Sequence, residues 1–136
     1  MFMPGSVFLD TNVLIYVLAQ NDPRGPRAEA LLAAGGMVGV QTLNEFVSVA
    51  RRKMHMPWKD VVEALDAIRV LCPSPVPLTI STHEAALKIA ENHDYGIYDA
   101  LVIAAALEAH CATLYSEDLQ DGQVIARKLT IRNPFN

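Results

Sequence analysis

Acidic side chains follow two apolar stretches of this chain. Asp10 comes directly after the apolar residues 7–9, and the later run ATLYS (112–116) is followed by three acids: Glu117, Asp118 and Asp121. Short runs of β-branched, aromatic and aliphatic residues are typical of buried strands. In an open α/β sheet, ligands bind at the carboxyl ends of the strands. These acids are therefore candidates for a binding or catalytic site.

Two further acids lie near the starts of predicted helices. Asp99 lies in the first turn of an apolar helix predicted over 98–110. There its negative charge either interacts favourably with the helix dipole, or is poorly solvated and needs a partner. Glu45 completes a T-x-x-E capping box that begins at Thr42, yet it also points away from the apolar stripe of its helix and can face a cleft. Asp10 is likewise a good helix cap. Each acid thus has a structural and a functional interpretation.

Carboxylates gathered at one edge of a sheet without basic partners repel one another unless a cation joins them. Ligands that are all oxygen favour Mg²⁺ or Mn²⁺. The histidines have no spacing, with each other or with cysteine, that indicates zinc, and we expect surface or core positions for all four: His55, His83, His93 and His110. The acids therefore point to a divalent metal site rather than a zinc site.

The chain has 136 residues, of which 51% are hydrophobic and 19% charged, so we expect a single domain over 1–136 with a proper core. Cys72 and Cys111 lie far apart, and no signal-like segment precedes them, which favours reduced thiols and a cytoplasmic protein. The longest apolar run, 100–107, is well short of the roughly 20 residues that a membrane span needs. We therefore expect a protein without a membrane partner.

The net charge of −4 by itself argues against a polyanionic partner, because phosphates are bound mainly through Lys and Arg. Two bound divalent cations would bring that charge to zero and leave the basic residues positive. The densest basic run is Arg51, Arg52 and Lys53, although such residues are most often solvated faces. The charge permits a nucleic-acid partner without proposing one.

Strand and helix patterns alternate along the chain, which predicts an α/β fold with a largely parallel sheet covered on both faces. Strands are predicted at 7–9, 37–42, 76–80 and 112–116, with a short edge strand within 129–135 because Pro134 is tolerated only at an edge or end. The helices between them are predicted at 13–18, 27–34, 43–54, 57–72, 81–93 and 98–110. A glycine pair, Gly35-Gly36, ends the second helix, and Ser81 with Glu84 forms a capping box for the fifth.

Four local sequence motifs carry the acids in order across almost the whole chain: LDTNVLIY with Asp10, NEF with Glu45, YDALVIAAAL with Asp99 and SEDLQDG with Asp118. In this order they resemble the acidic motifs of the PIN-domain ribonucleases, most closely the VapC-type toxins of bacterial toxin-antitoxin pairs. The resemblance implies an α/β/α sandwich of three layers around a central, largely parallel sheet of four or five strands. It also implies one or two Mg²⁺ or Mn²⁺ ions, a small antitoxin partner and a homodimer.

The resemblance also assigns roles to particular residues. Asp10, Glu45, Asp99 and Asp118 would be the catalytic metal ligands of an endoribonuclease in which a metal-activated water attacks the RNA phosphate. Three polar residues would support them by hydrogen bonds: Thr11, Asn12 and Ser116. The last motif offers three acids, and members of the family vary in which of them complete the site; we expect Asp118 to be a direct ligand, Asp121 to be an outer or second-metal ligand, and Glu117 to face solvent. The RNA backbone would be guided by the basic run of Arg51, Arg52 and Lys53.

Two other interpretations remain. A phosphatase with an Asp nucleophile, of the haloacid dehalogenase kind, also begins with an acid after its first strand, but its motif is D-x-D and the third place here is Asn12. A binding module on the same scaffold would keep the acids for an interaction or as caps. The apolar stretch 13–18 could serve a dimer interface, and burial in the core explains it equally well.

Overall fold

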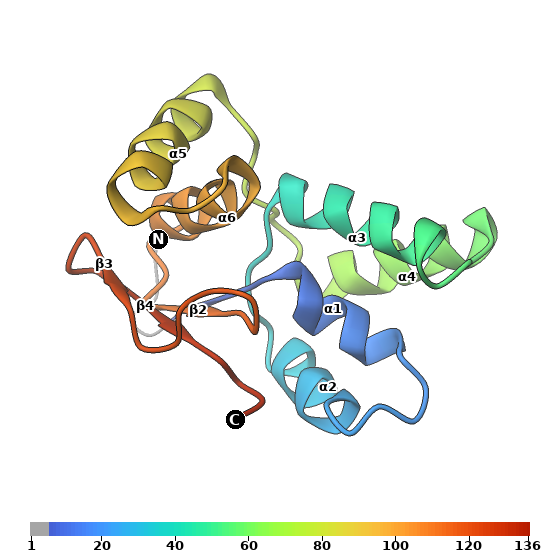
Figure 1. Cartoon of the computed structure of the whole chain (residues 1–136). Helices are drawn as coiled ribbons and strands as arrows, with labels where there is room; N and C mark the ends of the chain where they lie inside the picture. The colour runs from blue at the N-terminus through green and yellow to red at the C-terminus, as the bar shows by residue number, and fades with distance from the viewer. Residues whose placement is uncertain (1–5) are drawn as a thin grey trace.

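The computed structural model describes residues 6–136 of the chain, which have an α/β fold (Figure 1). In chain order its elements are β1 (Val7–Leu9), α1 (Thr11–Leu18), α2 (Gly25–Ala33), α3 (Val40–Arg52), α4 (Trp58–Leu71), α5 (Ile80–His93), α6 (Ile97–Glu108), β2 (Thr113–Tyr115), β3 (Val124–Ile125) and β4 (Leu129–Arg132). All six predicted helices are present. The second of them ends at a glycine in the left-handed conformation, Gly35, as the glycine pair predicts.

The sheet has four strands in the order β1-β2-β4-β3. β1, β2 and β4 are parallel, and β3 pairs antiparallel with β4. The prediction that the carboxyl-terminal segment forms an edge strand is wrong, because β4 lies between β2 and β3. Pro134 does not prevent this position, since it lies beyond the last residue of the strand. The true edge, β3, has only two residues and gives no readable alternation in the sequence.

The predicted strands at 37–42 and 76–80 are also wrong. They are reduced to isolated bridges, in which Met37 pairs with Phe8 and Gly39 pairs with Val76. Each segment turns into a helix instead: α3 begins at Val40 and α5 begins at Ile80. The β-branched residues in these segments are equally compatible with a short extended entry to a helix, which is why periodicity misassigned them.

Both helix starts use a threonine cap that the sequence analysis placed elsewhere. The Thr42 hydroxyl accepts a hydrogen bond from the Gly39 amide at 3.3 Å, so Thr42 is the third residue of α3 and not the residue before it. Thr79 caps α5, where its hydroxyl accepts from the Thr82 amide at 3.2 Å, in place of the predicted Ser81–Glu84 box. Because α3 starts earlier, Glu45 is released from a capping role and lies in its second turn.

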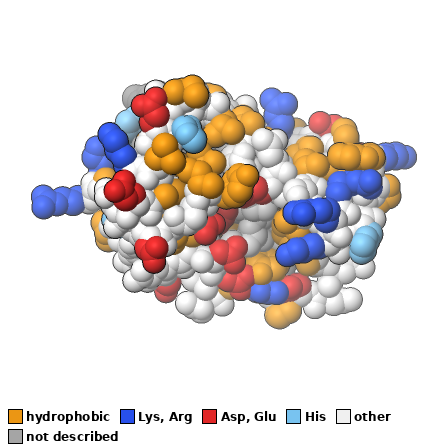
Figure 2. Space-filling view, turned by 45° about the horizontal axis from the view of Figure 1, so that its top comes forward, with side chains coloured by type: hydrophobic (Ala, Val, Ile, Leu, Met, Phe, Trp, Pro, Cys, Tyr) orange, Lys and Arg blue, Asp and Glu red, His pale blue; other side chains and the backbone are white. Residues whose placement is uncertain are grey.

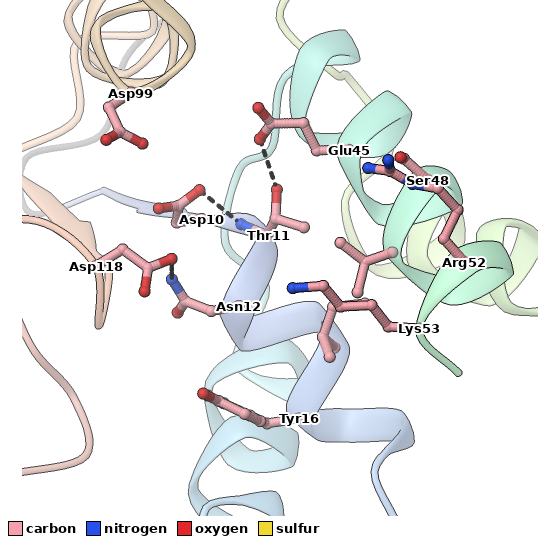
Figure 3. Close-up of a pocket in the computed structure, with 12 residues that line it drawn as sticks. Asp10, Thr11, Asn12, Tyr16, Glu45, Ser48, Arg52, Lys53, Asp99 and Asp118 are labelled. Carbon is pink, nitrogen blue, oxygen red and sulfur yellow. Dashed lines mark hydrogen bonds between the residues drawn. The ribbon is translucent and has the colours of Figure 1, made fainter. Parts of the chain in front are cut away.

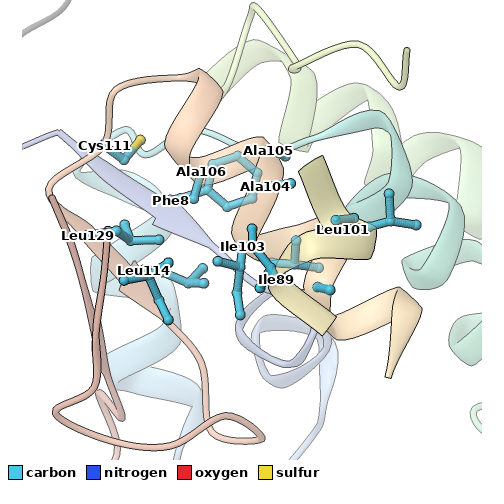
Figure 4. Close-up of a cluster of buried hydrophobic side chains, with 14 of the residues drawn as sticks. Phe8, Ile89, Leu101, Ile103, Ala104, Ala105, Ala106, Cys111, Leu114 and Leu129 are labelled. Atoms are coloured by element: carbon cyan, nitrogen blue, oxygen red, sulfur yellow. The ribbon is translucent and has the colours of Figure 1, made fainter. Parts of the chain in front are cut away.

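Two buried clusters, one on each face of the sheet, make the domain a sandwich of three layers, as predicted. Phe8 packs with α5 and α6 on one face (Figure 4), and Leu9, the next residue, packs with α1, α2 and α3 on the other. Alternate residues of a strand point to opposite faces, so β1 contributes to both cores. Val13 and Leu14 are buried in the second cluster, so these two residues of stretch 13–18 cannot form part of a dimer surface.

Helix α6 is the central helix of its layer, as its composition predicts. Residues 100–106 are all buried against α5 and the sheet, so the helix is held on every side and its first turn is fixed in place. Cys72 and Cys111 are free and buried. Within residues 6–136, no helix is long and apolar enough to cross a membrane.

Candidate metal and nucleic-acid site

Four acidic side chains from distant parts of the chain line one cavity of about 450 Å³ (Figure 3). Asp10 follows β1, Glu45 lies on α3, Asp99 on α6, and Asp118 in the loop after β2. The cavity opens at the carboxyl ends of β1 and β2, between the two helical layers. Figure 2 shows acidic side chains around a hollow in this face, with Lys and Arg side chains along one side.

Asp10 is both a helix cap and a cavity residue. One carboxylate oxygen accepts from the Thr11 amide at 2.7 Å, which caps α1, and the other accepts from the Ser116 hydroxyl at 2.7 Å. The Asp10 amide donates to the Tyr115 carbonyl at 3.0 Å, so the strand pairing itself brings Asp10 beside Ser116. Both oxygens are thus oriented, and only 5% of the residue is exposed.

The three polar residues Thr11, Asn12 and Ser116 hold the other acids. The Thr11 hydroxyl donates to Glu45 at 3.1 Å, and the Asn12 amide nitrogen donates to Asp118 at 3.2 Å. The Ser116 hydroxyl, which donates to Asp10, also accepts from the Asp118 amide at 3.1 Å. Asp10, Glu45 and Asp118 therefore belong to one hydrogen-bonded network across β1, α1, α3 and the loop after β2.

The pKa values of three of these acids are raised. Burial raises the pKa of Asp10 from 3.8 to about 6, against the hydrogen bonds from Ser116 and Thr11 that lower it. Burial also raises the pKa of Glu45 and of Asp99, and the neighbouring Asp118 carboxylate adds to both shifts. The sequence predicts raised values from mutual repulsion. The direction is confirmed, but loss of solvation is the larger cause.

Exposure is graded across the cavity. Asp10 is buried and Glu45 half-buried, whereas Asp99 and Asp118 are exposed. Asp99 is exposed because the apolar residues of α6 begin only after it, at Ala100, yet its surroundings still remove enough water to raise its pKa, in line with the expectation of a poorly solvated acid. An open side with two accessible carboxylates suits a site that a charged ligand enters from solvent.

Two of the three residues in the basic run reach the same cavity. Arg52 and Lys53 line it, and Figure 3 shows both on the α3 side, opposite Asp99 and Asp118. Arg51 lies elsewhere: its guanidinium donates to the Met56 carbonyl at 2.8 Å and stacks over the Trp58 ring. Positive charge for a polyanion is therefore present beside the acids.

The other two acids of the SEDLQDG loop are placed apart from the cavity lining. Asp121 accepts a hydrogen bond from the Asn133 amide at 2.8 Å, which ties the loop to the carboxyl-terminal segment. The prediction that Glu117 simply faces solvent is wrong. Glu117 pairs with Arg24 at 2.9 Å and accepts from the Tyr16 hydroxyl, while Arg24 lies 3.8 Å over the Tyr16 ring. This cluster holds the loop that carries Asp118 against α1.

The uncharged part of the cavity wall was not predicted from the sequence; it consists of Ile15, Tyr16, Ser48 and Val49. A signal for them is present. On α3 the lining residues are spaced at i, i+3, i+4 and i+7 from Glu45, which is one face of a helix. Once Glu45 is assigned to a cleft, that spacing identifies Ser48, Val49 and Arg52 as its neighbours.

The donor set fits a hard divalent cation by its chemistry. All four acids offer oxygen, which Mg²⁺ and Mn²⁺ prefer, and the cavity wall holds no thiol or imidazole. Within residues 6–136, no three such side chains already converge on one point closely enough to hold an ion. Asp99 and Asp118 are accessible from solvent, whereas both oxygens of the buried Asp10 are hydrogen-bonded.

Comparison with known proteins places this geometry in context. A family model described as the PIN domain matches residues 7–122. Among curated proteins, none matches the chain at the level of sequence.

Two solved structures share the fold. VapC20 of Mycobacterium tuberculosis, described as a toxin that cleaves the sarcin-ricin loop, superposes with a TM-score of 0.65 at 25% identity; the match covers 83% of this chain and 90% of that one. VapBC2 of Rickettsia felis, bound to a DNA fragment from its promoter, superposes with a TM-score of 0.64 at 17% identity, over 93% of this chain and 97% of the other. The second likeness is evidence for the fold alone.

Proposed function

The chain belongs to the PIN domain family, and on that basis we propose that it is a metal-dependent endoribonuclease of the VapC type, the toxin of a toxin-antitoxin pair. One observation carries the proposal: Asp10, Glu45, Asp99 and Asp118 come from four separate segments and line one cavity. Carboxylates at such density cost stability unless they bind a cation. The likeness to a toxin that cleaves an RNA loop supports RNA as the substrate.

The four acids would hold one or two Mg²⁺ or Mn²⁺ ions. A bound divalent cation supplies Lewis acidity toward the scissile phosphate and lowers the pKa of water. The network around Ser116 and Thr11 keeps Asp10 and Glu45 in fixed orientations, so little reorganisation is needed when the ion and substrate enter. Asp99 and Asp118 close the site from its exposed side. We propose Asp121 as an outer residue that anchors the loop carrying Asp118.

The RNA backbone would enter along α3. Arg52 and Lys53 are exposed and line the cavity on that side, so each can pair with a phosphate next to the one that is cut. Arg51 is engaged with Met56 and Trp58, and contributes positive potential from a distance.

The phosphatase alternative loses support from the geometry at Asn12. In a D-x-D motif the third residue is a second acid, but here an amide at that place donates to Asp118 and Ser116. A binding module that keeps acids as caps or for an interaction would not need four acids from separate segments in one cavity. A metal-dependent hydrolytic site accounts for that arrangement.

We propose two protein partners for this toxin. Membership of the PIN domain family and the likeness to VapC20, which is described as a toxin, support a small antitoxin whose basic side chains would compete for the carboxylates. A second copy of the chain would form a homodimer, and large apolar side chains such as Val70 and Ile80 remain exposed on the described surface.

Removal of divalent metal is expected to abolish RNA cleavage by the purified chain. Single-stranded and structured RNA would be incubated with metal-depleted protein in EDTA, and then with Mg²⁺ or Mn²⁺ added in excess. Restored cleavage is expected with either metal. A nuclease that works equally well in EDTA would contradict the proposal, and so would protein that stays inactive toward every RNA at all metal concentrations.

A further inference from the structure

A second depression adjoins the acidic cavity and has a different character. Its volume is about 360 Å³, and it shares three wall residues with the cavity: Glu45, Ser48 and Arg52. The remaining wall is formed by Gln41, Asn44 and Tyr98. We call this depression the side groove. Because the two spaces share a wall, a chain that places a phosphate at the acids has its neighbouring nucleotide beside the side groove.

Tyr98 is the aromatic residue of this wall, and 62% of it is exposed. It immediately precedes Asp99, in the first turn of α6, and this turn is fixed because the rest of the helix is buried. A large aromatic ring left in water at the rim of a polar groove contributes nothing to the core. Its position is therefore available for a ligand with a flat face.

The side chains opposite are suited to the edge of such a ligand. Gln41 and Asn44 each carry an amide with two donors and an acceptor, and they lie three residues apart on α3, on one face of the helix. Asn44 is exposed, whereas Gln41 is half-buried and hydrogen-bonds to the Glu45 carboxylate, so Asn44 is the freer of the two amides. Amide side chains pair with the donor and acceptor edges of bases, and Arg52 on the shared wall can hold the intervening phosphate.

From this arrangement we propose that the side groove binds a nucleobase next to the scissile phosphate of single-stranded RNA, with Tyr98 stacked on the base and Gln41 or Asn44 at its edge. Recognition of unpaired RNA commonly combines aromatic stacking with hydrogen bonds to base edges. Stacking tolerates every base, so Tyr98 sets affinity, whereas the amides set preference. The inference rests on the proposed ribonuclease function and names a subsite for its substrate.

Replacing Tyr98 by leucine tests the stacking. We expect kcat/KM for RNA cleavage to fall roughly 5- to 150-fold, the range that loss of one base–aromatic stack produces, while Tyr98→Phe stays within about twofold. Because Tyr98 is exposed, both variants should fold and melt like wild type. Trp58→Leu is the matched control, since Trp58 is 58% exposed on α4 and lines neither space. It should cleave at the wild-type rate.

Abasic substrates show whether Tyr98 acts through a base. An abasic nucleotide is placed in turn at each position flanking the cut. At one position it should slow wild type as much as Tyr98→Leu does, and there the variant should lose nothing further. Asn44→Ala and Gln41→Ala should alter the ranking of bases at that position. Equal losses for Tyr98→Leu on intact and abasic RNA at every position would overturn the inference.

A binding measurement distinguishes failure of the side groove from failure of the proposed nuclease function. Affinity for a short single-stranded RNA is measured in the Asp99→Asn background with and without Tyr98→Leu, so that cleavage does not interfere. A loss of about 5- to 150-fold in affinity supports the side groove even if wild type proves not to be a nuclease. Unchanged affinity, or an equal loss for Trp58→Leu, would overturn the side groove while leaving metal-dependent cleavage intact.

Discussion

Asp99→Asn should abolish RNA cleavage and leave the metal-free protein at least as stable as wild type. Asparagine keeps nearly the same shape but removes one of the four negative charges that line the cavity, and the pKa of Asp99 is raised, so its charged form is disfavoured in the folded state. With one metal ligand lost, kcat/KM should fall roughly 100-fold or more. Mg²⁺ should raise the melting temperature of wild type and raise that of the variant much less.

Thermal unfolding in EDTA and in Mg²⁺, beside a cleavage assay, tests this expectation. Asp66→Asn is a suitable control because Asp66 is an exposed acid on α4 outside the cavity, and it should change neither activity nor the response to Mg²⁺. If metal-free Asp99→Asn melts well below wild type, Asp99 has a structural role at the start of α6. If it cleaves RNA at the wild-type rate, the four-acid site is wrong.

Lowering the pH from 7.5 to 4.5 should stabilise the metal-free protein through Asp10. Its pKa is about 6 in the folded chain against 3.8 for the ordinary side chain, so the folded state binds more protons. This contribution to stability is fully present below pH 3.8 and is lost as the pH rises through 6. Between pH 3.8 and pH 6 this difference in pKa changes the free energy of unfolding by roughly 3 kcal/mol in total.

Urea unfolding in EDTA at several pH values measures this dependence. In Asp10→Asn the side-chain oxygen still accepts from the Thr11 amide, and the new amide group can donate to the Ser116 oxygen in place of the long bond from Asn12 at 3.4 Å, beside the bond from the Asp118 amide. The variant should therefore fold, and its stability should change much less between pH 7.5 and 4.5. The same pH dependence of stability in the variant and in wild type would show that other groups cause it and that the pKa of Asp10 is not raised.

The positions of the acids could be predicted from the sequence because strand ends and helix faces are local properties. Asp10 was recognised at the end of β1, and Glu45 was assigned correctly to the side of its helix away from the core. Asp10 is a helix cap, as one interpretation predicts, and it also lines the cavity, where its second oxygen accepts from Ser116; a role as a metal ligand stays a prediction. A local pattern cannot show this, because the second partner, Ser116, lies far along the chain.

The wrong strands at 37–42 and 76–80 have a local cause, but the errors at β4 and Glu117 come from pairing between distant segments. The place of β4 inside the sheet depends on a two-residue strand, β3, that has no periodicity to read. The role of Glu117 depends on Arg24, which comes from the loop before α2. Asp99 has no basic residue near it in sequence, yet α3 brings Arg52 and Lys53 to the same cavity. Each contact becomes visible only once the layers are assembled.

The chemistry of the RNA ends tests the central claim most directly. If the four carboxylates activate water with a divalent cation, the 2′-hydroxyl takes no part in the attack. The products should then carry 5′-phosphate and 3′-hydroxyl ends, and a 2′-deoxy substitution at the cut should leave cleavage in place. Products that end in 2′,3′-cyclic phosphate, together with loss of cleavage on 2′-deoxy substitution, would contradict the account.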